Sequence, residues 1–159
     1  MKRILLIGII LTFIDQFIKL FVVSFMSYSD SIMIIKHFFS ITLVHNTGAA
    51  FSILSTNTFF LILVGIIALF LIYLFFIKDK EISKKNSILY GMLIGGILGN
   101  LIDRIFRGYV VDFLDFKIFG YDYPVFNFAD IFITISIIFI IIDIIRSDRN
   151  EVSSKRRWY

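Results

Sequence analysis

Four apolar stretches, each near the length needed to cross a lipid bilayer, constrain this sequence more than any other feature. They cover about residues 4–26, 58–77, 87–106 and 128–145. A helix needs about 20 apolar residues to span the hydrocarbon core, and each stretch is apolar all round. The composition agrees, since 58% of the residues are hydrophobic whereas soluble domains contain about 45–50%. We therefore expect residues 1–159 to form a single membrane-embedded domain, an α-helical integral membrane protein with four transmembrane helices.

Basic residues cluster on one side of these predicted spans. The cluster consists of Lys2, Arg3, Lys78, Lys80, Lys84, Lys85, Arg146, Arg149, Lys155, Arg156 and Arg157. The segments on the opposite side contain only Lys36, Arg107 and Lys117. Because cytoplasmic segments retain Lys and Arg, we expect a multi-pass protein with both termini in the cytoplasm. Residues 146–159 are expected to be a disordered basic tail attracted to anionic membrane lipid. No nucleic-acid partner is expected, because such binders spread their charge over a water-soluble face.

The two outer segments differ from ordinary short connections. Residues 39–44 alternate and are β-branched, and Asn-Thr-Gly at 46–48 is typical of a turn. This pattern predicts a small extracytoplasmic β-sheet between the first two helices. The segment from about 107 to 127 is rich in aromatic residues and carboxylates, and we expect it to be an extracytoplasmic loop that rests at the lipid interface.

Ionisable residues inside a membrane span are costly, so each is a candidate for function. In the first span, Asp15 and Lys19 are four residues apart and hence share one helix face. With the amino terminus in the cytoplasm, both lie toward the outer side. A structural ion pair explains them as well as a catalytic role does.

The third span combines glycines with polar residues near its outer end. The glycines recur every four residues at Gly91, Gly95 and Gly99. This spacing predicts a stripe against which another helix packs closely. Asp103 continues the stripe and should point into the bundle, and Arg104 stacks above Asn100 by the same four-residue rule. A polar network that only locks the bundle is the alternative interpretation.

The fourth span begins with a helix-capping pattern. Asn127 suits the N-cap, and Asp130 three residues later gains from the positive end of the helix dipole. Asp112 lies on the same outer side, soon after the third span ends. Polar residues from four separate segments thus share one depth: Asp15, Lys19, Asn46, Asn100, Asp103, Arg104, Asp112, Asn127 and Asp130.

The composition narrows the chemistry of such a cluster. The chain has no Cys and two His, which excludes thiolate nucleophiles and histidine-only metal cages, and we expect neither a metal nor a cofactor. Paired carboxylates remain, because two neighbouring Asp share one proton and can activate water. The helix dipole favours ionised Asp130, which leaves Asp112 more readily protonated. By spacing alone, Asp103 and Asp115 are alternative members of such a carboxylate pair. A small proton-coupled transporter also uses intramembrane carboxylates, and a noncatalytic scaffold would explain the glycine stripe alone.

Five short motifs occur in a fixed order along the chain. They are Asp15-Gln16 with Lys19, Asn-Thr-Gly-Ala-Ala-Phe at 46–51, Gly-Asn-Leu-Ile-Asp-Arg at 99–104, Val-Asp-Phe at 111–113 and Phe-Asn-Phe-Ala-Asp at 126–130. In this order and on four spans, the sequence resembles the bacterial lipoprotein signal peptidase family, also called signal peptidase II. The resemblance extends from about residue 10 to 135.

The resemblance implies an intramembrane aspartic endopeptidase of the bacterial cytoplasmic membrane. Such an enzyme removes the signal peptide from prolipoproteins, cutting just before a cysteine that bears diacylglycerol, at a site near the outer face. By motif, Asp112 and Asp130 correspond to the catalytic pair. The matching residues that line or brace the site are Asn46, Gly48, Asn100, Asp103, Arg104 and Asn127, with Asp15 and Lys19 as the first-helix pair. The aromatic segment near 107–127 would close over the scissile bond.

Overall fold

The four predicted spans form four long helices. The computed structural model describes residues 1–48, 57–78 and 81–156. Its helices are α1 (Lys2–Phe25), α2 (Thr58–Ile72, continued by a π-helical turn η2 over Tyr73–Ile77), α3 (Lys84–Arg107) and α4 (Phe128–Arg156). All four are long and apolar enough to cross a membrane. The predicted membrane fold is confirmed.

The central helix is α3, which contacts α1, α2 and α4. Its glycine stripe faces α1. A Cβ atom added at Gly91 would lie 2.7 Å from the Cβ of Ile7, and one at Gly95 would lie 2.9 Å from the backbone oxygen of Gly8. These contacts confirm the predicted close packing, because side chains larger than hydrogen would push the two helices apart.

A further glycine allows α4 to approach the other side of α3. A Cβ at Gly96 would lie 2.6 Å from the carbonyl oxygen of Ala129 and 2.8 Å from Cγ1 of Ile133. The four-residue spacing does not include this position, since Gly96 lies about 100° around the helix from Gly95. Two adjacent glycines thus bring two different helices close to α3.

The sheet is larger than predicted. Its strands are β1 (Ser31–Ile35), β2 (Phe39–Asn46), β3 (Val110–Ile118) and β4 (Tyr121–Asp122), in the order β1-β2-β3-β4 with antiparallel neighbours. The expected loop between the third and fourth helices is therefore wrong for 110–118 and 121–122, which form strands. Val110 to Phe113 are buried, so this strand lacks the alternation of buried and exposed residues that marks a half-buried strand in a sequence.

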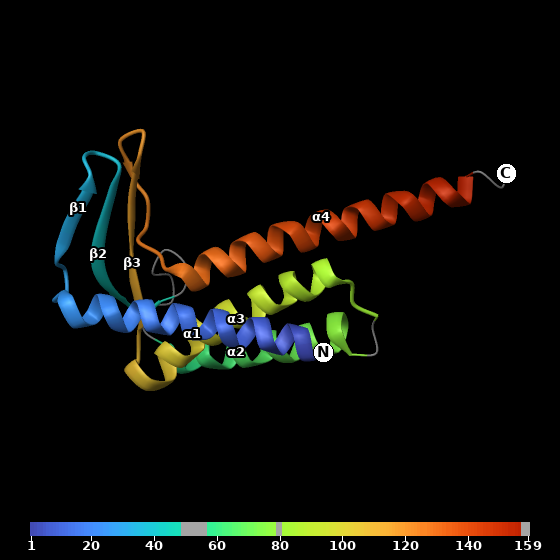
Figure 1. The fold of residues 1–159 in the computed structure, drawn as a ribbon, viewed down its shortest axis with the longest axis horizontal. Helices are drawn as coiled ribbons and strands as arrows, with labels where there is room; N and C mark the ends of the chain where they lie inside the picture. The colour runs from blue at the N-terminus through green and yellow to red at the C-terminus, as the bar shows by residue number, and fades with distance from the viewer. Residues whose placement is uncertain (49–56, 79–80, 157–159) are drawn as a thin grey trace.

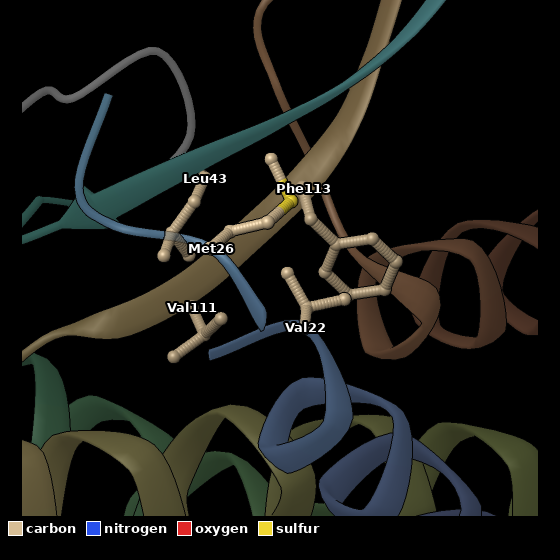
Figure 2. Close-up of a cluster of buried hydrophobic side chains, with 5 residues drawn as sticks. All are labelled: Val22, Met26, Leu43, Val111 and Phe113. Carbon is tan, nitrogen blue, oxygen red and sulfur yellow. The ribbon is translucent and has the colours of Figure 1, made fainter. Parts of the chain in front are cut away.

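A small apolar cluster attaches the sheet to the helices. Val22 near the end of α1 and Met26 just after it pack against Leu43 of β2 and against Val111 and Phe113 of β3 (Figure 2). Burial of these side chains fixes β3 relative to α1. The residue between Val111 and Phe113 is Asp112, whose position is set by the same contact.

The start of α1 and the end of α4 lie at the end of the helices opposite the sheet (Figure 1). The basic tail beyond residue 145 was expected to be disordered, and this expectation is wrong for its described backbone, because α4 continues to Arg156. Residues 146–156 contain neither Gly nor Pro, so nothing in the sequence interrupts the helix there.

Replacing Gly96 with alanine should destabilise the protein by about 1–3 kcal/mol, because the added methyl group meets backbone atoms of α4 that cannot move aside. Gly65→Ala in α2 is the matched control. Its Cβ would lie 3.3 Å from Cδ1 of Leu101, the end of a flexible side chain, so its stability should be unchanged or slightly higher. Thermal unfolding in detergent measures both. An equal melting temperature for the two variants would contradict the proposed α3–α4 contact.

Candidate active site

Asp112 and Asp130 reach one site from different elements. Asp112 lies in the middle of the buried part of β3, and Asp130 lies in the first turn of α4. The helix start has the predicted capping box: the backbone N–H of Asp130 donates to Oδ1 of Asn127 at 3.0 Å, and the N–H of Asn127 donates to Oδ2 of Asp130 at 3.2 Å. This reciprocal pair holds the Asp130 carboxylate at the helix terminus.

Three carboxamides surround the two carboxylates. The side-chain nitrogen of Asn127 donates to Oδ1 of Asp112 at 2.6 Å, and that of Asn46 donates to Oδ2 of Asp112 at 2.8 Å. Asn100 donates to Oδ1 of Asp130 at 2.8 Å. Asn127 thus binds both carboxyl groups, one through its side chain and one through its backbone. Every carboxylate oxygen of the pair accepts a hydrogen bond from an uncharged donor.

The two carboxyl groups line one cavity of about 720 Å³. Its charged and amide side chains are Asn46, Asn100, Arg104, Asp112 and Asp130, and Tyr123 and Thr134 add hydroxyl groups. The remaining wall is mainly aliphatic and aromatic, with contributions from β3, the segment before α4, and the first turns of α4. A mostly apolar cavity with a few convergent polar groups is typical of a ligand or substrate site.

Burial gives Asp112 an unusual affinity for a proton. The low-dielectric surroundings, and secondarily the charge of Asp130, raise the pKa of Asp112 to about 7, against the opposing effect of the hydrogen bonds from Asn46 and Asn127. Near neutral pH, about half of the Asp112 carboxyl groups therefore carry a proton. The pair can hold one proton between two carboxylates, as the sequence predicts for a site of this kind.

Beneath this site lies a cluster of fully buried charges. The Lys19 ammonium group lies 2.8 Å from Oδ2 of Asp15 and 2.9 Å from Oδ2 of Asp103, and all three side chains have 0% exposure. It also donates to Oδ1 of Asn100 at 3.0 Å. Asp15 and Lys19 thus form the predicted ion pair, with Asp103 as a third member.

Each buried carboxylate of this cluster also holds the backbone next to a site carboxylate. Oδ1 of Asp15 accepts the N–H of Ala129, the residue before Asp130, at 3.0 Å. Oδ2 of Asp103 accepts the N–H of Val111, the residue before Asp112, at 3.1 Å. The charge cluster therefore positions both halves of the site.

Arg104 and Gly48 meet at the edge of the cavity. Nη2 of Arg104 donates to the carbonyl oxygen of Gly48 at 2.9 Å, and the N–H of Gly48 donates to Oδ1 of Asn46 at 2.9 Å. The second bond confirms the predicted turn after β2. Residues 49–51 of the same motif lie outside the described residues.

The rival carboxylates have other partners. Asp103 binds Lys19, and Asp115 accepts a hydrogen bond from the Thr42 hydroxyl at 2.6 Å. Neither belongs to the cavity lining among the described residues. In the same part of the chain, no group of three His, Cys, Asp or Glu side chains is arranged to hold a metal ion.

Two contributors had no role assigned from the sequence, although one of them, Gln16, belongs to the first of the five motifs. Gln16 donates to the carbonyl oxygen of Gly99 at 3.0 Å and to Oδ1 of Asp103 at 3.1 Å. Arg107, interpreted above as an outer-loop charge, forms an ion pair with Asp103. The four-residue interval between Asp103 and Arg107 was the available signal for this pair.

Comparison with known proteins gives consistent matches. The family model described as signal peptidase (SPase) II matches residues 7–146. Lipoprotein signal peptidases of Staphylococcus aureus strains JH9 and Newman are each 44% identical over 148 residues, covering 92% of this chain and 90% of the relative.

Two solved structures of bacterial membrane enzymes, both obtained by the in meso method, are also similar. The structure at 2.3 Å resolution has a TM-score of 0.86 at 40% identity, covering 94% of this chain and 92% of the other. The structure at 1.9 Å resolution has a TM-score of 0.80 at 41% identity, covering 91% and 93%. Together with the family match over most of its length, these similarities show that the chain belongs to the signal peptidase II family.

Proposed function

We propose that this protein is an aspartic endopeptidase that removes signal peptides from prolipoproteins, cutting immediately before a cysteine that carries diacylglycerol. Asp112 and Asp130 are the catalytic residues. The observation that carries the proposal is the bridging of these two carboxyl groups by Asn127 at one mostly apolar cavity. The substrate follows from relatives named lipoprotein signal peptidase.

The unequal surroundings of the two carboxyl groups support distinct roles. Asp130, at the positive end of the α4 dipole, is the ionised group that accepts a proton from water. The water oxygen bonds to the scissile carbonyl carbon, and the carbonyl oxygen takes the proton of Asp112. When the tetrahedral intermediate collapses, the C–N bond breaks, Asp130 gives its proton to the leaving amine, and Asp112 regains one from the intermediate. The dyad ends with the proton it began with.

The distribution of charge supports a site on the outer side of the bacterial cytoplasmic membrane. The sheet lies at one end of the helices, and the start of α1 and the end of α4 lie at the other (Figure 1). The cavity is lined by residues of β2, β3 and the first turns of α4, on the side of the sheet. Lys2, Arg3 and the basic residues after Ile145 are near the termini, which favours cytoplasmic termini by the positive-inside rule.

The shape and composition of the cavity suit a substrate that is part peptide and part lipid. Its wall continues from Asp130 along α4 through Ile131 and Ile135, so a signal peptide can lie along the helix. The β3–β4 hairpin completes the wall through Phe116 of β3 and Tyr123, which directly follows β4. Acyl chains of the substrate can remain in the surrounding membrane lipid.

Asp112→Asn and Asp130→Asn should each lower turnover by at least about 1,000-fold, because an amide can neither accept a proton from water nor deliver one to the carbonyl oxygen. Asp115→Asn, three residues from Asp112 on the same strand, is the matched control and should keep normal turnover. Cleavage of a purified prolipoprotein in liposomes, followed by mass spectrometry of the products, measures all three.

The same assay tests the substrate and the folding of the variants. Cleavage should occur immediately before the lipidated cysteine and should be much slower without the diacylglyceryl group. Thermal unfolding confirms that inactive variants are folded. Near-normal turnover by a folded Asp112→Asn or Asp130→Asn variant would show that the assigned pair is wrong.

The value of kcat/KM should fall above about pH 7. The pKa of Asp112 is raised to about 7, so its proton is present below this pH and is lost above it. Loss of one required proton reduces the rate about tenfold per pH unit. The profile is measured in one detergent at constant ionic strength. A kcat/KM that keeps rising to pH 9 would mean that Asp112 acts in its ionised form.

Tyr123→Ala should raise KM several-fold while kcat changes little, because the ring forms part of the cavity wall next to the substrate. Tyr28→Ala removes another aromatic ring, which is exposed and outside the cavity lining, and serves as the control. Steady-state kinetics with the lipidated substrate measures both variants. An unchanged KM for Tyr123→Ala would exclude the hairpin from substrate binding.

A further inference from the structure

We propose that Lys19 is a positioning residue that acts through Asn100 to keep the negative charge of the catalytic pair on Asp130, leaving the shared proton to Asp112. This inference rests on the function proposed above and assigns a role in proton placement to a residue that does not line the cavity.

The ammonium group of Lys19 contacts three acceptor side chains. It forms ion pairs with Asp15 at 2.8 Å and Asp103 at 2.9 Å, and it donates a hydrogen bond to Oδ1 of Asn100 at 3.0 Å. With 0% of its side chain exposed, it has no access to water. Its orientation is therefore fixed by these three contacts.

These contacts determine which way the Asn100 amide faces. Its Oδ1 accepts from Lys19 at 3.0 Å and from the side-chain nitrogen of Asn127 at 3.1 Å. Its nitrogen is consequently directed to Oδ1 of Asp130, at 2.8 Å. A positive charge on one end of an amide strengthens the donor at the other end. Hydrogen bonds thus run from Lys19 to Asn100 and from Asn100 to Asp130, and they favour a carboxylate at the last position.

No comparable chain leads to Asp112. The side-chain nitrogen of Asn127 donates both to Oδ1 of Asn100 and to Oδ1 of Asp112. Because Asn127 is a donor to Asn100 and not an acceptor in the chain that starts at Lys19, the charge of Lys19 does not strengthen its hydrogen bond to Asp112. The other donor to Asp112 is Asn46, whose own oxygen accepts only a backbone N–H, that of Gly48, among the described residues. Within the described part of the chain, Asp112 therefore accepts hydrogen bonds only from uncharged donors, and the charge of Lys19, which acts on it through space, is outweighed by burial and the charge of Asp130.

Charged groups surround the pair from four elements, α1, α3, β3 and α4. They are Asp15 and Lys19 on α1, Asp103, Arg104 and Arg107 on α3, Asp112 on β3 and Asp130 on α4. Arg104 donates to the carbonyl oxygens of Gly48 and Asn100, so its hydrogen bonds go to the backbone and not to either catalytic carboxylate.

The variants for the test are chosen so that the buried charges stay balanced. Lys19→Met alone would leave two buried carboxylates with one cation, Arg107, which is costly. Asp15→Asn/Lys19→Met removes one charge of each sign and leaves Asp103 with Arg107. Asp15→Asn alone is the matched control, because the amide oxygen can still accept from Ala129. Arg107→Gln controls for the loss of a cation that does not contact Asn100.

The measurement is kcat/KM against pH for these variants and the unmodified protein. In Asp15→Asn/Lys19→Met, the acid side of the profile should move to higher pH by about one unit, a tenfold change in proton concentration. At pH values on this acid side, kcat should fall by up to about tenfold with KM within about twofold. Asp15→Asn and Arg107→Gln should keep the acid side in place. A role in folding alone would lower stability without moving the profile.

Two outcomes would overturn the inference: a double variant whose profile matches that of Asp15→Asn, or an equal shift in Arg107→Gln. If the double variant does not fold, Asn100→Ala, which cuts the chain but keeps the ion pairs of Lys19, should show the same shift, and an unmoved profile in this variant would overturn the inference. If Asp112→Asn and Asp130→Asn are inactive but the pH profile of the double variant is unmoved, only the role of Lys19 is rejected. Activity in either of those variants would instead reject the proposed function.

Discussion

The buried ammonium group of Lys19 is the interaction on which the rest of the structure depends. Removing a charge from water costs several kcal/mol unless partners compensate it, and here the partners come from α1 and α3. Asp15 binds a backbone N–H of α4 through its other oxygen, and Asp103 binds one of β3 through the same oxygen that contacts Lys19. Satisfying one cation thus fixes three helices and the central strand at a single depth.

This cluster is possible only because glycine brings the helices close. A Cβ at Gly99 would lie 2.5 Å from Oδ2 of Asp15 and 3.3 Å from Cβ of Ala129, so any larger residue there would displace the carboxylate that binds both Lys19 and α4. The charge cluster therefore depends on the glycine stripe. Small residues set the distance between helices, and the charges determine their register.

Local patterns in the sequence were sufficient for the spans, the glycine stripe, the capping box of Asn127 and Asp130, and the pairing of Asp15 with Lys19. Each of these depends on residues within a few positions of one another. The strand at 110–118, the contact of Gly96 with α4 and the joining of Asp112 to Asp130 through Asn127 depend on residues distant in the sequence. Periodicity carries no information on such partners, which is why spacing left Asp103 and Asp115 as rivals. The match to a family's motifs favoured Asp112 and Asp130 instead.

The origin of the two carboxyl groups explains why they differ. Asp112 comes from a buried strand whose own backbone groups are used by β2, so its side chain is surrounded by apolar neighbours and neutral amides, and its pKa rises to about 7. Asp130 comes from a helix N-terminus, where the N–H of Asn127 and the helix dipole favour negative charge. Two identical side chains thereby lie in unlike surroundings: burial raises the pKa of Asp112, whereas Asp130 accepts hydrogen bonds at a helix N-terminus. The two carboxyl groups differ because one comes from a strand and the other from a helix N-terminus. If both came from equivalent positions on two helices, their surroundings would be alike, and other neighbouring groups would have to make them differ.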